Sequence, residues 1–433
     1  MIGRHIFDTT VARLRAFRRD DRGATAIIVG IAFPVLVGGM GMGAEVGYWY
    51  FTQRTLQEAA DVAAHAGGVR KAAGDTKPKI DSTALYIAQQ SGFSPGIIAV
   101  NVPPTAGTYA GNPGAVEVLL SRSLPPLFSS VFLSSNVDVG GRAVALVEFN
   151  SKACMLALST TEDRAINISG STTVNLTNCD VASNSTASDA FYVGGSGQIT
   201  TDCVYTSGGA DTTSGLHLSE CSAVSQYQLP TADPYAGVPE PQSPSTCPNG
   251  GTINGGTVSP PDTGPDRGKR CFKNGLSIKS TVHFDPGVYI IDGGTFTINN
   301  DAVVTGSHVM FYFKNGGDLK INGTSVLNLS APSPTFEHPI LETYSGLLFF
   351  GERDSALAAN TIKVNGTSGS TFTGAVYFPS SDVEYTGNST TTGGCTQVIG
   401  LTITLTGNSD FQSDCSDDGT SDILTGPQVS LVE

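Results

Sequence analysis

The sequence predicts a mainly β protein that is attached to a membrane by one N-terminal helix. Two observations carry this prediction. Residues 24–44 contain no charged side chain, and the chain combines only 14 % charged residues with 52 glycines and a second half rich in Ser, Thr and Asn. Such a composition is typical of turn-rich β structure rather than of helical bundles. At 433 residues the chain is long enough for two or three units.

Residues 23–44 are expected to form a transmembrane helix. The 21 uncharged residues from Ala24 to Ala44 would rise about 31 Å as a helix, which is close to the hydrocarbon thickness of a bilayer. Pro34 is tolerated in such a helix because neighbouring groups can satisfy the freed carbonyl. Gly39 and Gly43 form a small-xxx-small pair that permits close approach of another helix. A buried core helix is the alternative.

The charges on the two sides of this segment predict its orientation. Residues 1–22 form a basic tail, whereas Glu45, Glu58 and Asp61 follow the apolar run. By the positive-inside rule the tail lies in the cytoplasm and the bulk of the chain lies outside it. The net charge is −14, and the exported part lacks the basic face that binding of phosphates requires. Nucleic acid is therefore not expected as a partner.

A helical pattern continues beyond the apolar run. Leu56, Ala60, Ala63 and Gly67 recur at helical spacing and predict a narrow stripe of mostly small residues. Aromatic residues 48–50 lie just past the span, where headgroups favour amphipathic rings. A cleaved secretory signal is the main rival interpretation, but the apolar stretch is too long for one and runs directly into this helix.

The N-terminal region resembles that of the TadE/TadG-like proteins of bacterial Flp (Tad) pilus systems. The resemblance begins with DRGATAIIVGIAFPVLVGGMGMGAEVGYWYFTQRTLQEAADVAAHAGG and continues through NVPPTAGTYAGNPGAVEVLLSRSLPPLF and VDVGGRAVALVE, so it covers roughly residues 20–148. It implies a membrane-anchored, pilin-like accessory of pilus assembly in the bacterial inner membrane. Its implied partners are pilus-assembly proteins or pseudopilins.

Two departures from the family refine this interpretation. Some relatives are cut after a glycine by a prepilin peptidase and carry a glutamate five residues into the mature chain. If Gly23 marks the cut, that position is Ile28, so the chain resembles the uncleaved TadG-type branch, with a retained signal anchor. Many TadG-like proteins carry a von Willebrand A domain with a D-x-S-x-S metal motif, and this sequence has no such motif.

Residues 45–149 are predicted to form an α+β unit, which the resemblance describes as pilin-like. The long helix comes first, and a second short helix is expected near STALYIAQQSG. Strands are expected at IIAVNV, AVEVLLS and VGGRAVALVEF. Pro-Pro pairs at 103 and 125 mark the breaks between them, because proline cannot donate to a ladder.

Residues 150–433 are predicted to form a right-handed parallel β-helix, with a β-sandwich as the alternative. Short strands recur around x-G-[NST] turns, as in INISGSTTVNL, LKINGTSVLNL and LTITLTGNSDF, at spacings near 20 to 25 residues. Repetition of this kind is typical of a stacked solenoid, and Asn and Gly suit a tight turn at the same place in successive coils. The Pro-rich stretch at about 229–271 is expected to be an extended insertion that lies over the solenoid or joins two parts of it.

All eight cysteines lie in this module, and an even count in an oxidising compartment predicts disulfides. Sequence alone allows 105 pairings, but four sequential intervals each span about one coil and could staple neighbouring coils. These pairs are Cys154 with Cys179, Cys203 with Cys221, Cys247 with Cys271, and Cys395 with Cys415. Metal binding is the alternative, although no C-x-x-C motif is present.

The sequence shows no defensible catalytic or cofactor motif. A carbohydrate-active β-helix would need two carboxylates at a fixed separation; the candidates, which solvated turns also explain, are Asp285, Glu337, Glu352 and Asp354. The histidines without metal spacing, interpreted as surface or wedge residues, are His217, His283, His308 and His338. A weak Ca²⁺ candidate is the cluster Asp410, Asp414, Asp417 and Asp418. The sequence thus predicts a structural or interaction protein without catalysis, and the competing prediction is a membrane-tethered module that binds or cuts surface polysaccharide.

Overall fold

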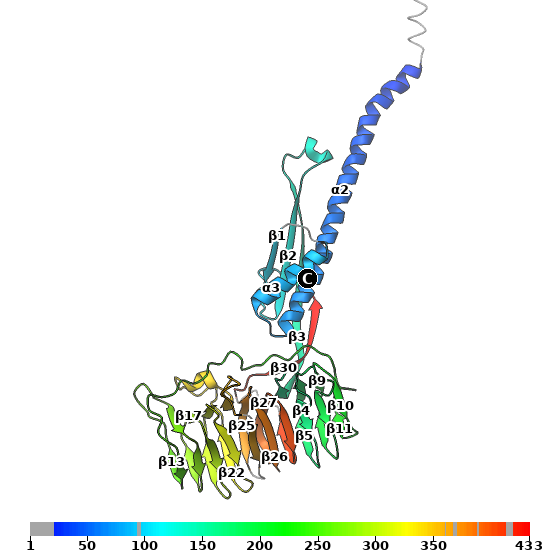
Figure 1. Ribbon diagram of the computed structural model, residues 1–433. Helices are drawn as coiled ribbons and strands as arrows, with labels where there is room; N and C mark the ends of the chain where they lie inside the picture. Colours follow the sequence, from blue (N-terminus) through cyan, green and yellow to red (C-terminus); the bar gives the residue numbers. More distant parts are fainter. Residues whose placement is uncertain (1–20, 93–96, 360, 367–369, 388, 413–418) are drawn as a thin grey trace, which may run out of the picture. The chain divides into compact units, whose positions relative to one another are not determined.

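The computed structural model describes residues 21–92, 97–359, 361–366, 370–387, 389–412 and 419–433. The chain divides into two compact units (Figure 1). The first contains the described residues up to Lys71 together with Thr76–Leu146 and Val429–Glu433, and the second contains Ala72–Asp75 and Val147–Gln428. The predicted basic tail, residues 1–22, lies almost entirely outside the described residues.

The first unit is built on one long helix, α2 (Asp21–Ala72). The predicted stripe is confirmed: Leu56, Ala60 and Ala63 are at most 3 % exposed. They pack with the second helix, α3 (Lys77–Gln90), and with the sheet. Gly67 permits this close packing, because a Cβ there would lie 3.0 Å from Val116 Cγ1. The small residues of the pattern therefore set how closely α2 approaches its neighbours.

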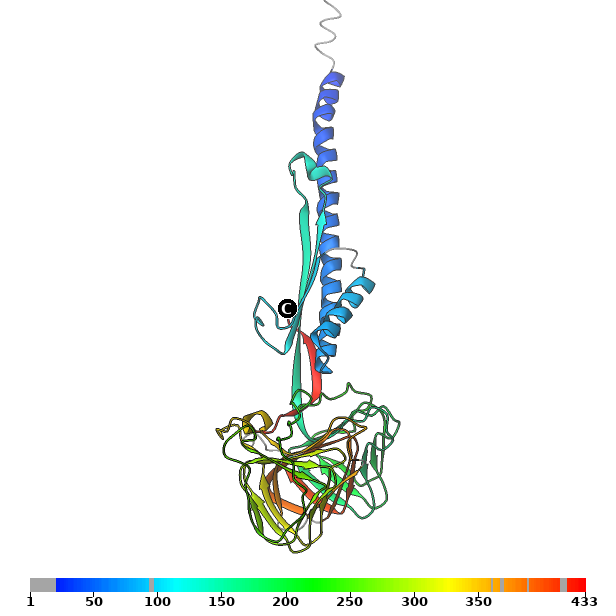
Figure 2. The ribbon, with the colours of Figure 1, turned by 60° about the vertical axis from the view of Figure 1, so that its left-hand side comes forward.

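The sheet of the first unit is antiparallel and has the three predicted strands. They are β1 (Ile97–Asn101), β2 (Ala115–Leu124) and β3 (Val137–Ala157). β2 pairs with both β1 and β3, and Figure 2 shows the β2–β3 hairpin running alongside α2. The hairpin loop contains a short 3-10 helix, η1 (Phe128–Val131). The end of the chain also returns to this unit, where Val144 N donates to Glu433 O and Val432 N donates to Val144 O.

The second unit is a β-solenoid with three parallel ladders. The first ladder has ten strands, one from each coil, and strands such as β4 and β18 alternate buried and partly buried residues. Partner residues such as His283 and Thr305 are 22 positions apart, within the predicted coil spacing. Because the described pairings within the three ladders are all parallel, the β-sandwich alternative is wrong: such sandwiches are built from antiparallel sheets.

The strands of the three ladders are the following. The first ladder contains β4 (Ile166–Ile168), β7 (Phe191–Val193), β10 (Ala210–Thr212), β12 (Thr252–Ile253), β15 (Leu276–Ile278), β18 (Thr295–Ile298), β21 (Asp318–Ile321), β24 (Thr361–Gly366), β26 (Asp382–Gly387) and β28 (Ile403–Thr406). The second contains β5 (Thr173–Thr177), β8 (Gln198–Thr201), β11 (Leu216–Leu218), β13 (Gly256–Val258), β16 (Val282–Phe284), β19 (Val303–Gly306), β22 (Val326–Ser330) and β29 (Asn408–Gln412). The third contains β6 (Asp180–Ser183), β9 (Val204–Thr206), β14 (Lys269–Lys273), β17 (Gly287–Asp292), β20 (Val309–Lys314) and β23 (Leu347–Gly351), with the end of β3 and parts of β25 (Thr371–Phe378) and β27 (Ser389–Gly400). A 3-10 helix, η2 (Leu341–Tyr344), and the last strand, β30 (Ile423–Leu431), complete the chain.

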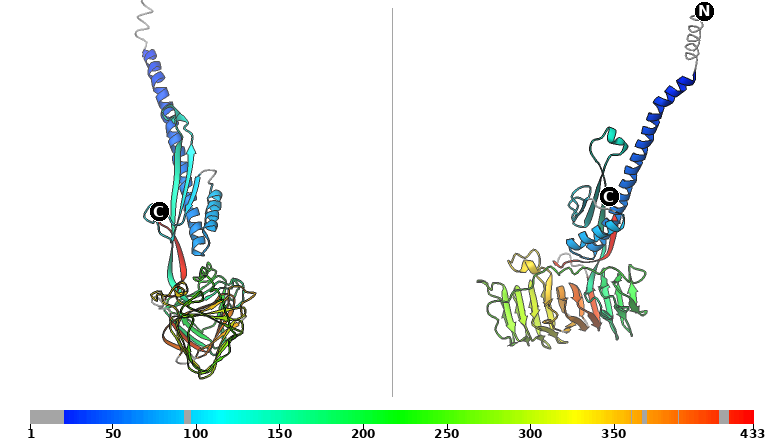
Figure 3. Two further views of the ribbon diagram at one scale, coloured as in Figure 1. Left: turned by 90° about the vertical axis from the view of Figure 1, so that its left-hand side faces the viewer. Right: turned by 45° about the horizontal axis from the view of Figure 1, so that its top comes forward.

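The coils do not stack in the order of the sequence. The chain enters the solenoid in its middle, where β3 lies between β27 and β6 and β4 lies between β28 and β7. From there it coils to one end, at β9 to β11, crosses to the opposite end, and coils back from β12 to β29. Figure 3 shows the result, with orange C-terminal coils beside green coils from the first part of the module. The solenoid is thus continuous in space although its two halves are joined by a crossing segment.

Left-handed residues form one corner of the solenoid in successive coils, where the third ladder leads into the first, which is a different corner from the predicted x-G-[NST] turns between the first and second ladders. Asn274 and Gly275 follow β14, and Asn315 and Gly316 follow β20, all with positive φ. Gly294 occupies this corner in the intermediate coil, and a Cβ there would lie 2.5 Å from Asn274 C. The corner therefore requires glycine both for its backbone conformation and for the close stacking of coils.

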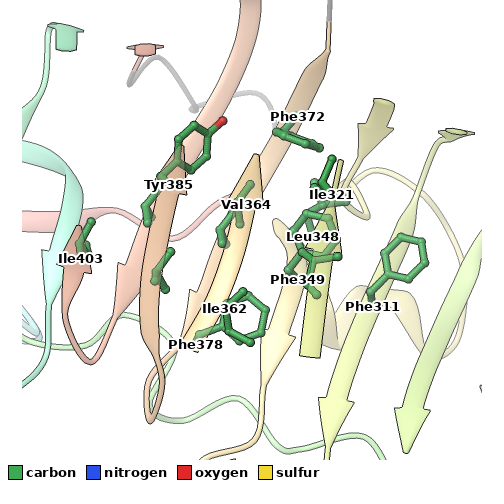
Figure 4. Close-up of a cluster of buried hydrophobic side chains, with 14 of the residues drawn as sticks. Phe311, Ile321, Leu348, Phe349, Ile362, Val364, Phe372, Phe378, Tyr385 and Ile403 are labelled. Carbon is green, nitrogen blue, oxygen red and sulfur yellow. The ribbon is translucent and has the colours of Figure 1, made fainter. Parts of the chain in front are cut away.

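The interior of the solenoid is a continuous apolar column. Phe311, Phe349 and Phe372 are fully buried in it, and Figure 4 shows these rings pointing into the space between the ladders. The third ladder is buried on its outer face as well, which explains its unbroken apolar runs such as GVYII and VMFYF. This outer face is covered partly by a segment that contains Tyr235, itself 1 % exposed.

We call residues 219–251 the strap, because they cross from the end of β11 to the start of β12. The strap lies within the region where the sequence predicts a Pro-rich insertion, at about 229–271, but the last part of that range is not an extended segment. Residues 252–273 form a coil, with strands β12, β13 and β14. The short strands avoid the prolines of this coil, which lie at 260, 261 and 265. The high proline content therefore made this regular coil hard to recognise from the sequence.

Within the described residues three disulfides staple the module, and they are three of the four sequential pairs that the intervals predict. Cys154–Cys179, Cys203–Cys221 and Cys247–Cys271 have Cα–Cα distances of 5.6, 5.2 and 4.8 Å. The third one ties the end of the strap to β14. Cys415 lies outside the described residues, so the pairing of Cys395 with Cys415 stays a prediction.

Arg353 holds the middle of the strap. Its Nη1 donates to Val238 O and its Nη2 to Tyr235 O, both at 2.7 Å, and the guanidinium lies 4.8 Å from the centre of the Phe350 ring. Its backbone N donates to Glu240 at 2.8 Å. One side chain therefore joins two strap carbonyls to the outer face of the third ladder.

We expect Arg353→Ala to loosen the strap without unfolding the coils. Loss of two hydrogen bonds from a charged donor should cost roughly 2–4 kcal/mol locally, and new proteolytic cuts should appear within 219–251. Arg164→Ala is the matched control. Arg164 also stacks on a ring, that of Tyr192, and forms an ion pair with Asp189, and neither of these partners belongs to the strap. Equal protease resistance of both variants would contradict this role of Arg353.

Candidate functional site

The exposed half of α2 is the first candidate site. The part of the chain from Thr25 to Ala72 is long and apolar enough to cross a membrane, with a mean hydropathy of 2.0 in its most apolar window. Large apolar side chains on it are exposed, from Ile27 (66 %) to Met40 (76 %). Water disfavours such a surface, whereas bilayer hydrocarbon accommodates it.

Two residues of this half are covered, and both meet the β2–β3 hairpin. Between Thr25 and Tyr48 the buried residues are Gly41 and Glu45, one helical turn apart. The Glu45 carboxylate accepts hydrogen bonds from Leu127 N and Ser129 N, both at 2.6 Å, and from Ser129 Oγ at 2.8 Å. At Gly41 a Cβ atom would overlap the Phe128 ring. The hairpin is thus fastened to α2 at the end of the uncharged run.

We call residues 124–136 the hairpin tip. Its sequence, LPPLFSSVFLSSN, has no charged residue. Its exposed apolar side chains are those of Leu127 (59 %), Phe128 (52 %), Val131 (80 %), Phe132 (76 %) and Leu133 (40 %). A cluster of five large apolar side chains in one exposed loop is unusual for a surface that faces only water.

A buried ion pair fixes the sheet of the first unit. Glu117 is fully buried and accepts hydrogen bonds from Arg142 Nε at 2.7 Å, from Asn101 Nδ2 at 2.8 Å, and from Thr105 N and Oγ1 at 3.0 and 2.9 Å. Burial alone would raise the pKa of the Glu117 carboxyl, but these hydrogen bonds lower the pKa to about 2. Arg142 also pairs with Glu433 at 2.5 Å, so the network reaches the returning end of the chain.

The solenoid surface carries a polar pocket of about 510 Å³ near the β13 end. Asp285 lies in its wall, accepts from Ser259 Oγ at 2.5 Å and lies 3.6 Å from His283 Nε2. Because the serine bonds to the carboxylate and not to the imidazole, this group is not a catalytic triad. The lining residues with charged or titratable side chains are Asp262, Arg267, Asp285 and His338.

The amino-acid sequences of two segments match known family models. Residues 23–73 match the Flp pilus-assembly TadE/G-like family. By this similarity we call residues 23–73 the TadE/G-like domain. Residues 245–416 match a domain of unknown function, DUF7305. No curated protein and no solved structure is significantly similar to the chain.

The TadE/G-like domain contains the apolar run, Gly41 and Glu45, so the fastening point of the hairpin lies within it. The sequence pointed to the apolar run but not to this fastening, because Glu45 was interpreted only as an acidic flank of the span. The one local signal was a lone glutamate directly after an apolar run, followed by a Gly and aromatic residues. Its partners lie 82 and 84 positions away, and sequence spacing does not indicate such distant contacts.

Outside the TadE/G-like domain, the predicted carboxylates have separate local settings. Asp285 belongs to the pocket, and Glu352 is buried and accepts from Asn315 N at 2.6 Å. Asp354 accepts from Ala356 N two residues away at 3.0 Å, and Glu337 is exposed. The exposed Glu337 and Asp354 agree with the interpretation as solvated turn carboxylates, whereas the buried Glu352 does not.

The predicted histidines divide into two groups. His217 and His283 are exposed, as expected for surface residues. His308 and His338 instead flank Phe336, with ring centres 4.0 and 6.3 Å from it and nearly parallel planes. Burial lowers the pKa of both His308 and His338, so neutral rings are favoured in this stack.

The predicted metal ligands are mostly outside the described residues. Asp410 lies in β29, and Asp414, Asp417 and Asp418 fall in the undescribed stretch 413–418. Among the residues that the structure describes, one group of potential ligands converges, formed by Cys247, Cys271 and Asp292. Its two sulfurs are joined in a disulfide, and metal binding requires free thiolates. This group therefore does not fit a metal ion.

Proposed function

We propose that the protein is a membrane-anchored component of Flp/Tad pilus assembly or of surface attachment, with a structural or interaction role and no catalysis. The observation that carries the proposal is the coincidence of the exposed apolar helix with the TadE/G-like domain. The pilin-like first unit would contact pilus-assembly proteins or pseudopilins. The solenoid would offer a long polar face for recognition.

The proposed location is the bacterial inner membrane, with a cytoplasmic N-terminus and the bulk of the chain outside the cytoplasm. The arginines before the span support this orientation. The three disulfides support it independently, because disulfides persist in oxidising compartments and are rare in the cytosol.

The N-terminal segment is proposed to stay on the protein as a signal anchor. Ile28 stands where a processed pseudopilin would carry a glutamate. N-terminal sequencing of the membrane-extracted chain should therefore find residues that precede Gly23. A chain that starts at Ala24 would place the protein in the processed branch instead.

Deletion of the gene tests the role in pili. We expect fewer pili by electron microscopy and weaker adherence to surfaces, both restored by the full chain. The matched control is a chain with Val35→Asp and Leu36→Asp. Both residues are exposed in the apolar run, at 72 % and 63 %. Because charges at the centre of a span are costly, this chain should restore neither phenotype. Normal pili and normal adherence after deletion would contradict the proposal.

Surface polysaccharide is the second candidate partner. The polar pocket beside β13 supports it, because Asp262, Asp285 and Arg267 offer hydrogen-bonding groups and the nearby His308–Phe336–His338 stack offers ring surface. Binding of envelope glycans to the full chain can be measured on a glycan array. Arg267→Ala should weaken such binding, whereas Arg164→Ala, in the turn before β4, should not. Unchanged binding by both variants would rule out the pocket.

A further inference from the structure

We infer that the hairpin tip inserts into the membrane leaflet from which α2 emerges, so that the first unit contacts the bilayer at two places. This inference rests on the proposed function in one respect, namely that the apolar half of α2 spans a membrane. The occupant of the tip surface is therefore lipid, at the boundary between headgroups and acyl chains.

The fastening of the tip sets its depth. Phe128 packs over Gly41, three residues before the end of the uncharged run at Ala44. At 1.5 Å of rise per residue, this contact lies about 4.5 Å inside the end of that run. If residues 24–44 lie in the bilayer, a group that touches Gly41 from the side lies at the edge of the hydrocarbon layer.

The composition of the tip suits this depth. Fifteen consecutive residues between Arg122 and Asp138 are uncharged, and the most exposed large side chains among them are Val131 and Phe132, at 80 % and 76 %. An apolar surface flanked by charged residues is typical of segments that lie in the membrane interface. The charged residues remain at the base of the hairpin, on the side away from the tip.

Several polar groups of the tip are satisfied within the first unit, which lowers the cost of placing them next to lipid. Phe132 N and Leu133 N donate to Ser129 O, both at 2.8 Å, and Ser130 Oγ donates to Leu127 O at 2.5 Å. The Glu45 carboxylate, which would otherwise be a bare charge next to the hydrocarbon, accepts three hydrogen bonds from Leu127 and Ser129. Glu45 is thus a positioning residue that holds the tip and is shielded by it.

Fluorescence quenching in nanodiscs tests the insertion. The full chain has one tryptophan, Trp49, so Trp49→Phe gives a silent background for single tryptophans. In lipids with brominated acyl chains we expect about a twofold loss of emission from Phe132→Trp, because bromine quenches only at contact depth. Tyr86→Trp is the control outside the membrane, since Tyr86 is 59 % exposed on α3, and its emission should not change.

Ile31→Trp separates failure of this inference from failure of the proposed function. Ile31 is 69 % exposed in the apolar run, so its tryptophan should be quenched whenever α2 spans the bilayer. If Ile31→Trp is quenched and Phe132→Trp is not, α2 spans the bilayer but the tip does not insert, and the inference is overturned. Cross-linking of the tip to a second copy of the chain would then identify a protein as its occupant. If Ile31→Trp is not quenched, the membrane proposal fails and the inference fails with it.

A second variant tests the role of Glu45. Adding Glu45→Ala to the Phe132→Trp chain should reduce the quenching, because the tip loses its fastening to α2. Glu58→Ala is the matched control, since Glu58 is on the same helix, is largely exposed and forms an exposed ion pair with Arg54. It should leave the quenching unchanged. Undiminished quenching in Glu45→Ala would show that Glu45 does not position the tip.

Discussion

Replacement of Glu117 by Gln should destabilise the first unit by roughly 3–5 kcal/mol, the usual cost of breaking a buried ion pair by removing one partner. The amide would leave Arg142 without its buried carboxylate and would offer donors where Asn101 and Thr105 already donate. Trp49 packs against the core of this unit and is the one tryptophan of the chain. Its fluorescence during urea unfolding of the full chain therefore measures the effect on this unit.

The matched control for this substitution is Glu58→Gln. Glu58 lies on α2 with an exposed side chain and forms an exposed ion pair with Arg54, and such pairs contribute little to stability. We expect a change below about 0.5 kcal/mol. Similar losses in both variants would contradict the importance of the buried network.

Glu117 also predicts how stability depends on pH. Its pKa is about 2 in the folded protein, below the ordinary value of 4.5, so folding favours the ionised form. The stabilisation is fully present above the unfolded pKa of 4.5 and is lost as the pH falls from about 5 toward 2. Its size is on the order of 3 kcal/mol. Trp49-monitored unfolding should lose stability over this range, and Glu117→Gln should flatten the dependence; an unchanged slope would contradict the assignment.

Replacement of Phe311 by Ala should destabilise the central coils of the solenoid by about 3–5 kcal/mol, as truncation of a buried Phe usually does. The Phe311 ring lies 5.1 to 5.7 Å from four other rings, those of Phe284, Tyr289, Phe296 and Phe349, and is fully buried (Figure 4). Its loss would leave a cavity that spans neighbouring coils.

The effect of Phe311→Ala should be local, because each coil of a solenoid contacts only its neighbours. Hydrogen exchange measured by mass spectrometry should show lost protection in β17, β20 and β23 and much less change in β6 and β9. Tyr227→Ala, at a position that is 75 % exposed on the strap, is the control and should change nothing in these strands. Uniform loss of protection over all coils would contradict the local character of the packing.

Local patterns predicted much of this fold. The uncharged run, the helical stripe from Leu56 to Gly67 and the recurring x-G-[NST] turns are short-range signals, and each corresponds to an element of the structure. The disulfide pairs were predictable for a related reason. Each interval is about one coil, so the solenoid geometry favoured sequential pairs among the 105 possible pairings, and three of the four sequential pairs lie within the described residues.

Long-range relations were not predictable in this way. Nothing in the residues of β3 and β28 indicates that the coils around them are neighbours, because every coil offers a similar apolar edge. The return of residues 429–433 to the first unit was unpredictable for a similar reason, because it depends on contacts between residues far apart in the sequence. The coil at 252–273 was missed for a different reason, since its strands of two to five residues are too short to outweigh the prolines around them.

The candidate sites were predicted unevenly. The apolar span is a local property and was found, whereas the hairpin tip was noted only as part of a resemblance. The contact of the tip with α2 depends on Glu45 and Ser129, 84 positions apart, and on the absence of a side chain at Gly41. Glycine occurs in membrane spans for several reasons, so the sequence alone does not explain Gly41. Its role became evident from the contact with Phe128 in the structure.

The most direct test of the central claim is protease protection of the full chain in spheroplasts of the native bacterium. The proposed topology predicts that the chain sediments with alkali-washed inner membranes and that external protease removes the solenoid, leaving a short membrane-embedded N-terminal fragment that contains α2. An intact chain in the soluble fraction, or a membrane-bound solenoid that external protease reaches only after lysis, would contradict the account.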